Sequence, residues 1–166
     1  MTMSLLALFL IAFAFGTAEF VIAGILPDVA TGLGVTIPVA GYLITGYAIG
    51  ITLGGPLLAI VTKKLSRKAL ILLLGSVFTA GQVLCAVAPS FEFLMAARVL
   101  VAVVHGTYFG IAMVVAVSLV PAERRGFAVA LILSGLTVSN VVGVPLGAAL
   151  GNVWGWRATF WGVGAL

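Results

Sequence analysis

Five long apolar runs constrain this chain more than any other feature of its sequence. A helix needs about 20 mostly apolar residues to cross about 30 Å of hydrocarbon. The runs that reach this length are Ser4 to Leu26, Pro38 to Thr62, Ala69 to Ala88, Phe91 to Val120 and Gly126 to Leu150. They predict an all-α fold, a polytopic bundle of transmembrane helices.

A sixth apolar stretch begins near Arg157 and reaches only as far as Leu166. Its length of roughly ten residues is too short to cross the hydrocarbon. We therefore expect residues 1–166 to form a single membrane domain of five full spans and a partial sixth helix that is cut off part-way.

The composition points to lipid as the main partner of this chain. Hydrophobic residues make up 63% of the sequence and charged residues 7%, with a mean hydropathy of +1.35. Such a chain lacks the polar side chains needed to cover a water-soluble globule. The first run is not a secretory signal, because no basic segment precedes it and it contains Glu19. We expect a retained first helix.

The basic residues are distributed unevenly. Six of the eight Lys and Arg residues lie in the connections after the second and fourth runs: Lys63, Lys64, Arg67, Lys68, Arg124 and Arg125. The positive-inside rule then places these connections and the amino terminus in the cytoplasm. Because the basic residues flank helices and do not form a stripe with aromatic residues, we expect no nucleic-acid partner.

Small residues recur at every fourth position in three of the runs. They are Gly46, Gly50 and Gly54, then Ala102, Gly106 and Gly110, then Gly135, Ser139, Gly143, Gly147 and Gly151. Small residues at this spacing form grooves in which a second helix approaches closely. The pattern is compatible with static helix packing and with an interface that slides or rocks.

Two charged residues lie inside the predicted spans at matching depth. Glu19 stands about seven residues before the outer end of the first span, and Arg98 about seven residues after the outer start of the fourth. Both are then about 10 Å below the outer surface, so we expect them to form an ion pair or to titrate against each other. They either handle protons or substrate, or make a purely structural pair between helices.

Three further polar residues lie in the spans. His105 follows Arg98 by seven residues and so shares its helix face, nearer the cytoplasm. It is a candidate for proton handling or for a hydrogen bond across a close helix contact. Asn140 is a candidate for a substrate cavity that also contains Glu19, whereas Gln82 is interpreted as structural.

The sequence contains no constellation typical of an enzyme. A lone histidine cannot supply a metal cluster, and the carboxylates are not paired. The glycines follow no phosphate-binding pattern. We therefore expect no catalytic residues, metal or cofactor and no ATP-driven pumping, which leaves secondary transport or a passive role.

The fourth and first spans carry motifs that resemble a known family. Arg98-Val-Leu-Val-Ala-Val-Val-His105-Gly106 is similar to the fourth-helix motif of drug:proton antiporters, and Gly16-Thr-Ala-Glu19-Phe is similar to their first helix. The whole chain resembles the amino-terminal half of a major facilitator superfamily transporter of the twelve-span antiporter type. Its arabinose-efflux-like and chloramphenicol-resistance-like members are the most similar. The resemblance implies proton coupling through Glu19, Arg98 and His105.

The fifth run carries a second motif of the same family. Gly143-Val-Pro145-Leu-Gly147 is similar to the antiporter motif, in which glycines and a proline shape a bend facing the other half of the transporter. The resemblance implies that these three residues take part in conformational gating.

The connection after the second run departs from the family pattern. Lys63 stands where the family usually has Asp, and Ser66 replaces a glycine, whereas Arg67 and Lys68 keep the basic pair. The resemblance implies a gating role for Arg67 and Lys68, although the acidic member of the family's charge relay is missing here. Topology alone is the alternative explanation of this cluster.

The resemblance also implies a function. It predicts proton-coupled efflux of small molecules, of drug or sugar type, by alternating access from a bacterial inner membrane. The partners would be protons, a small-molecule substrate, and either a missing carboxy-terminal half or a second copy of the chain. The alternative is a truncated half-transporter or membrane partner without transport activity of its own.

Overall fold

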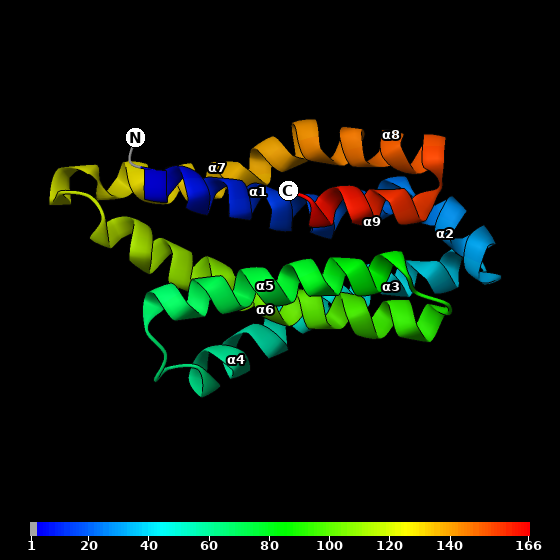
Figure 1. The fold of residues 1–166 in the computed structure, drawn as a ribbon, viewed down its shortest axis with the longest axis horizontal. Coiled ribbons are helices and arrows are strands. Elements are labelled where there is room, and N and C mark those ends of the chain that lie inside the picture. Colours follow the sequence, from blue (N-terminus) through cyan, green and yellow to red (C-terminus); the bar gives the residue numbers. More distant parts are fainter. Residues whose placement is uncertain (1–2) are drawn as a thin grey trace.

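The computed structural model describes residues 3–166, which fold into a bundle of long helices (Figure 1). Within residues 3–166, five helical segments are long and apolar enough to span a membrane: Met3–Gly24, Ile37–Val61, Arg67–Ala86, Phe91–Ser118 and Ala122–Trp154. The predicted all-α bundle with five full spans is confirmed, and its bounds differ from those of the apolar runs by at most four residues at either end.

The first, third and fourth spans are single α-helices, and the second and fifth are composite. The elements are α1 (Met3–Gly24), α2 (Leu26–Leu33), α3 (Ile37–Ile49), η1 (Gly50–Gly54), α4 (Gly55–Val61), α5 (Arg67–Ala86), α6 (Phe91–Ser118), η2 (Ala122–Arg124), α7 (Arg125–Val138), η3 (Ser139–Gly143), α8 (Val144–Trp154) and α9 (Trp156–Gly164). The second span joins α3, η1 and α4, and the fifth joins η2, α7, η3 and α8. The sixth apolar stretch forms α9.

The segment after α1 contains the short helix α2, although its prolines and glycines are typical of a loop. Pro27 lies in the first turn of α2, where its missing N–H costs no hydrogen bond. Gly34 ends the helix in a left-handed conformation with φ of 67°, which a glycine adopts without strain. Val29 and Ala30 are buried and anchor α2 to the bundle.

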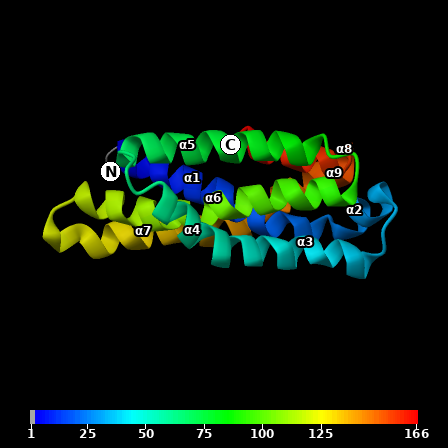
Figure 2. The ribbon, with the colours of Figure 1, turned by 90° about the horizontal axis from the view of Figure 1, so that it is seen from below.

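The spans are arranged in two layers. Figure 1 shows α1, α7, α8 and α9 in one row and α3, α4, α5 and α6 in the other. Figure 2 shows α5 along one side of the bundle and α3, α4 and α7 along the opposite side, with α1 and α6 between them. The amino terminus, the α4–α5 connection and the α6–α7 connection lie at one end of the bundle. Both basic clusters are therefore at the end where the chain begins.

The small residues of the fifth span pack against α1 along its length. A Cβ atom added to Gly135 would lie 2.8 Å from the Ala12 Cβ atom, and one added to Gly147 would lie 2.7 Å from Val21 Cγ2. Ser139 contacts Gly16 in the same way. The pattern at every fourth residue therefore produces close helix packing within one layer, as predicted.

The backbones of the second span and α6 approach each other closely where Gly55 packs against Gly106. A Cβ atom added to Gly55 would lie 2.9 Å from the Gly106 Cα atom, and one added to Gly106 would lie 2.7 Å from the Ile51 carbonyl oxygen. A Cβ atom added to Gly110 would meet nothing within 4 Å. Gly55 thus makes the backbone contact, and the predicted groove on α6 ends before Gly110.

The two composite spans contain the same local feature. Each has one π-helical segment near its middle, η1 in the second span and η3 in the fifth. Pro56 follows η1 by two residues and Pro145 follows η3 by two residues. A proline removes one helical hydrogen bond and crowds the carbonyl of the preceding turn. A wider π-turn before it relieves that crowding.

The apolar core is divided into two clusters along the bundle. One cluster includes Leu8, Phe15 and Tyr47, and the other includes Ile22 and Leu43. Four residues separate Leu43 from Tyr47 on α3, so the two clusters meet about one helical turn apart. Arg98 of α6, which contacts both Leu43 and Tyr47, lies at this junction.

Candidate functional site

Arg98 forms hydrogen bonds to three backbone carbonyls. Its side chain is 2% exposed. The guanidinium donates to the carbonyl oxygens of Ala18 at 3.2 Å and Glu19 at 3.5 Å on α1, and to that of Leu43 at 3.4 Å on α3. Arg98 also lies over the ring of Tyr47, 4.6 Å from its centroid. A buried cation of α6 therefore connects the two layers through backbone dipoles.

The expected ion pair between the Glu19 carboxylate and Arg98 is not formed. The matching depth is confirmed, because Arg98 reaches the Glu19 main chain, but depth along a helix does not determine where a side chain points. Among the described residues, the ionisable side chain within 4 Å of the Glu19 carboxylate is His105, with Nε2 3.9 Å from Oε2. The Glu19 side chain is 26% exposed, whereas that of His105 is 5% exposed.

His105 is enclosed by side chains from three helices. The hydroxyl of Tyr47 on α3 lies 3.0 Å from Nδ1 of the ring. The rings of Phe15 on α1 and Phe109 on α6 have centroids 5.0 Å and 5.1 Å from that of His105. The structure therefore brings Glu19, His105 and Arg98 together, as the shared helix face predicts, and adds Tyr47 to them.

Asn140 does not join this group. It is exposed on η3, and its side-chain amide donates to the Leu136 carbonyl oxygen of its own helix at 2.9 Å. No side-chain contact among the described residues joins Asn140 to Glu19. A substrate cavity that contains both would therefore have to be lined in part by other residues. Gln82 is buried, and its Oε1 atom has no hydrogen-bond partner among residues 3–166.

The gating candidates of the fifth span face two directions. Gly143 and Gly147 are buried against α1, and the Gly147 carbonyl oxygen accepts a hydrogen bond of 2.8 Å from Thr159 on α9. Pro145 is exposed. The π-helical segment η3 lies at the position of the predicted bend; Gly143 and Gly147 pack within the bundle, and Pro145 faces outward.

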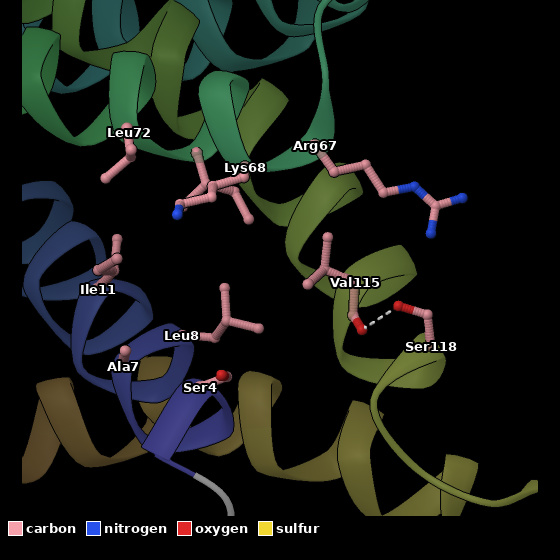
Figure 3. A pocket seen from close by; sticks show the side chains of 10 residues that line it. Ser4, Ala7, Leu8, Ile11, Arg67, Lys68, Leu72, Val115 and Ser118 are labelled. Carbon is pink, nitrogen blue, oxygen red and sulfur yellow. Dashed lines mark hydrogen bonds between the residues drawn. The ribbon is translucent and has the colours of Figure 1, made fainter.

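Arg67 and Lys68 begin α5 at the basic end of the bundle. Ser66 caps this helix by accepting a hydrogen bond of 3.3 Å from the Ala69 amide. Two cations in the first turn oppose the helix dipole, so helix stability does not explain them. Both residues line a cavity of about 420 Å³ between α1, α5 and α6. Figure 3 shows Lys68 extending toward α1 and Arg67 extending away from it.

Two tyrosines of the site have no distinct signal in the sequence. Tyr108 on α6 donates to the Leu8 carbonyl oxygen of α1 at 2.6 Å, and Tyr47 contacts His105. In the sequence, each looks like an ordinary aromatic residue within an apolar run. Tyr108 lies three residues after His105 and ten after Arg98, so the helical period could have placed it on the same face.

Replacing Arg98 with alanine should destabilise the bundle strongly. The change removes three hydrogen bonds that connect α6 to α1 and α3, and it leaves a cavity. Hydrogen bonds between membrane helices contribute about 0.6 to 1.7 kcal/mol each, so we expect a loss of about 2 to 5 kcal/mol. Unfolding by SDS titration in mixed micelles measures it. Arg124→Ala, at an exposed position, should change the stability by less than about 0.5 kcal/mol. Equal stability of the two variants would contradict the role of Arg98 as a connection between layers.

Comparison with known proteins identifies relatives along almost the whole chain. The family model of the Major Facilitator Superfamily matches residues 8–166. The chain is 44% identical over 156 residues to the inner membrane transport protein YdhP of Escherichia coli (strain K12), covering 94% of this chain and 40% of the relative. It is 43% identical over 150 residues to a chloramphenicol resistance protein of Streptomyces lividans, covering 90% of this chain and 38% of the relative.

The fold also matches a solved structure. The crystal structure of a bacterial homolog to the human lysosomal transporter Spinster, in an inward-facing and unoccupied conformation, superposes with a TM-score of 0.84 at 24% identity. The match covers 98% of this chain and 40% of that chain. The chain therefore spans about two fifths of the length of these relatives, and its fold is that of their amino-terminal half.

Proposed function

This chain belongs to the major facilitator superfamily, and we propose that it forms one half of a secondary transporter that exports small molecules in exchange for protons. The observation that carries the proposal is the Glu19 carboxylate beside His105, with Arg98 bound to the same turn of α1. An ionisable group within a membrane span is costly unless it is hydrated or paired, and such groups mark ion and proton pathways.

The proposed mechanism is alternating access. A substrate site near the middle of the membrane opens to one side and then to the other as two six-helix halves rock against each other. Protonation of Glu19 removes a charge from the site and so changes the free-energy difference between the inward-open and outward-open states. Residues 1–166 are proposed to act as one membrane domain, and the second half would come from the same polypeptide or from a second copy.

Three features support the direction, the orientation and the location. A relative named as a chloramphenicol resistance protein favours export over uptake. Both basic clusters lie at the same end as the amino terminus, which favours a cytoplasmic amino terminus under the positive-inside rule. A relative named as an inner membrane transport protein supports a bacterial inner membrane as the location.

The remaining site candidates keep proposed roles. Arg67 and Lys68, at the exposed start of α5, are proposed to gate the conformational change, together with the bend formed by Gly143, Pro145 and Gly147. Asn140 is proposed to line the substrate cavity, with its remaining walls supplied by the second half.

Proton-driven export is tested by reconstituting the full-length protein in inside-out vesicles. Radiolabelled chloramphenicol is the first probe. We expect accumulation when the vesicle interior is acidic, and loss of that accumulation when an ionophore collapses the proton gradient. Vesicles prepared without the protein are the control. Binding of the probe without gradient-dependent accumulation would favour a membrane partner that has no transport activity of its own.

A further inference from the structure

His105 presents its two ring nitrogens to two different helices. Nδ1 lies 3.0 Å from the hydroxyl of Tyr47 on α3, and Nε2 lies 3.9 Å from Oε2 of Glu19 on α1. Tyr47 is 2% exposed and His105 is 4% exposed, so water does not compete freely for the contact between them. The hydrogen bond at Nδ1 therefore affects whether Nε2 presents a hydrogen or a lone pair to Glu19.

The environment of the ring favours one tautomer. A neutral imidazole has one N–H donor and one acceptor nitrogen, and an ionised carboxylate only accepts. A hydrogen on Nε2 faces the Glu19 carboxylate favourably, whereas a lone pair there would be repelled by it. Nδ1 is then the acceptor, and the Tyr47 hydroxyl is the donor that satisfies it.

The surroundings of Tyr47 suit it to this role. Its ring lies between His105, at 5.8 Å and 68° in an edge-to-face contact, and Arg98, whose guanidinium is 4.6 Å from the ring centroid. A cation over the ring draws electron density from the phenol and strengthens its hydroxyl as a donor. Phe15 and Phe109 pack against the His105 ring and restrict its rotation.

We propose that Tyr47 is a positioning residue: its hydroxyl donates to Nδ1 of His105 and holds the ring in the tautomer whose Nε2–H faces Glu19. The ionisable groups that contact His105 are Glu19 from α1 and Tyr47 from α3, and Arg98 of α6 contacts Tyr47. Tyr47 would thereby set how strongly the neutral imidazole stabilises the ionised carboxylate. The role of Tyr47 in transport rests on the proposed proton-coupled function, whereas the tautomer of His105 is a property of the protein at rest.

The sequence makes the proposal directly measurable, because His105 is the only histidine of residues 1–166. The polypeptide of residues 1–166 is labelled with ¹⁵N- and ¹³C-histidine, purified with an affinity tag that lacks histidine, and placed in lipid nanodiscs. The two ring nitrogens are assigned by their couplings, since Nε2 is bonded to both ring CH carbons and Nδ1 to one. We expect the hydrogen on Nε2 and an unprotonated Nδ1 whose signal is displaced by hydrogen bonding.

Tyr47→Phe removes the hydroxyl and keeps the ring. We expect the Nδ1 signal to lose its hydrogen-bond displacement and to move to the position of a free acceptor nitrogen. Tyr42→Phe is the matched control on the same helix, because Tyr42 is 61% exposed, and it should leave both ring signals unchanged. An Nδ1 signal that is the same in wild type and Tyr47→Phe would overturn the proposal.

The wild-type spectrum alone provides a second test that does not require the variant to fold. A hydrogen found on Nδ1 in the neutral ring would refute the proposed tautomer. Because neither measurement involves transport, failure here leaves proton-coupled export open, and failure of export leaves the tautomer assignment intact.

Discussion

Replacing Glu19 with glutamine is expected to abolish proton-driven export while leaving the helical bundle intact. Glutamine has nearly the size of glutamate and resembles its protonated form, but it cannot gain or lose a proton at neutral pH. Glu19 is partly exposed at 26%, so the neutral amide brings no steric or solvation penalty that would unfold the bundle. A carrier fixed in the neutral state cannot link its conformational change to the proton gradient.

The measurement is probe accumulation in vesicles of the full-length protein with an imposed pH gradient. Exchange of labelled for unlabelled probe without a gradient should persist, which separates a coupling defect from loss of binding. Glu92→Gln is the matched control, because it makes the same chemical change at an exposed position in the first turn of α6. Unchanged gradient-driven export by the Glu19→Gln variant would refute the coupling role. Arg98→Ala should also weaken coupling, since it releases the Glu19 backbone from α6.

Gly106→Leu is expected to prevent stable folding of the bundle. Even a Cβ atom at this position would lie 2.7 Å from the Ile51 carbonyl oxygen and 3.0 Å from the Gly55 Cα atom. These are backbone atoms, so the clash cannot be relieved by turning a side chain, and the second span must move away from α6. Overpacking a well-packed core costs about 1 to 3 kcal/mol, and forcing two backbones apart should exceed about 3 kcal/mol.

Gly110 provides the matched control for this substitution. It lies one turn further along α6, and a Cβ atom there meets nothing within 4 Å. Gly110→Leu should therefore cost less than about 1 kcal/mol, since leucine also has the higher helix propensity. SDS unfolding of both variants tests the pair. Similar losses for Gly106→Leu and Gly110→Leu would mean that the two backbones do not meet as described.

The spans could be predicted from the sequence because hydrocarbon requires long apolar helices. The helix α2 could not, because Pro27 and Gly34 are typical of a loop, although the same two residue types also begin and end helices. The decision depends on tertiary packing: Val29 and Ala30 are buried against the rest of the bundle, and a single sequence does not show that.

The closest contact of the second span shows a related limit. Counting every fourth residue selects Gly54, yet Gly55 meets the Gly106 backbone. A π-turn contains more residues than an α-turn, so the face of the helix advances by about one residue across η1. The sequence pattern assumes a constant helical period and cannot anticipate that change.

The candidate site was predicted in part. Helical spacing and depth bring Arg98, His105 and Glu19 to one region, because both follow from rise per residue and turn angle. The pairing within the region depends on side-chain rotamers, and here the guanidinium binds backbone carbonyls while the carboxylate faces the imidazole. Tyr47 came from another helix, which no spacing within α6 could reveal.

The π-turns of η1 and η3 make the bending stiffness of this bundle uneven. Each occurs before a proline near the middle of a span, one in each layer. The ladder of helical hydrogen bonds is interrupted there, so a change of curvature at these points breaks fewer hydrogen bonds than elsewhere. Spans one, three and four have an uninterrupted ladder. Deformation of the protein should therefore be concentrated in the second and fifth spans, while α1, α5 and α6 move as rigid rods.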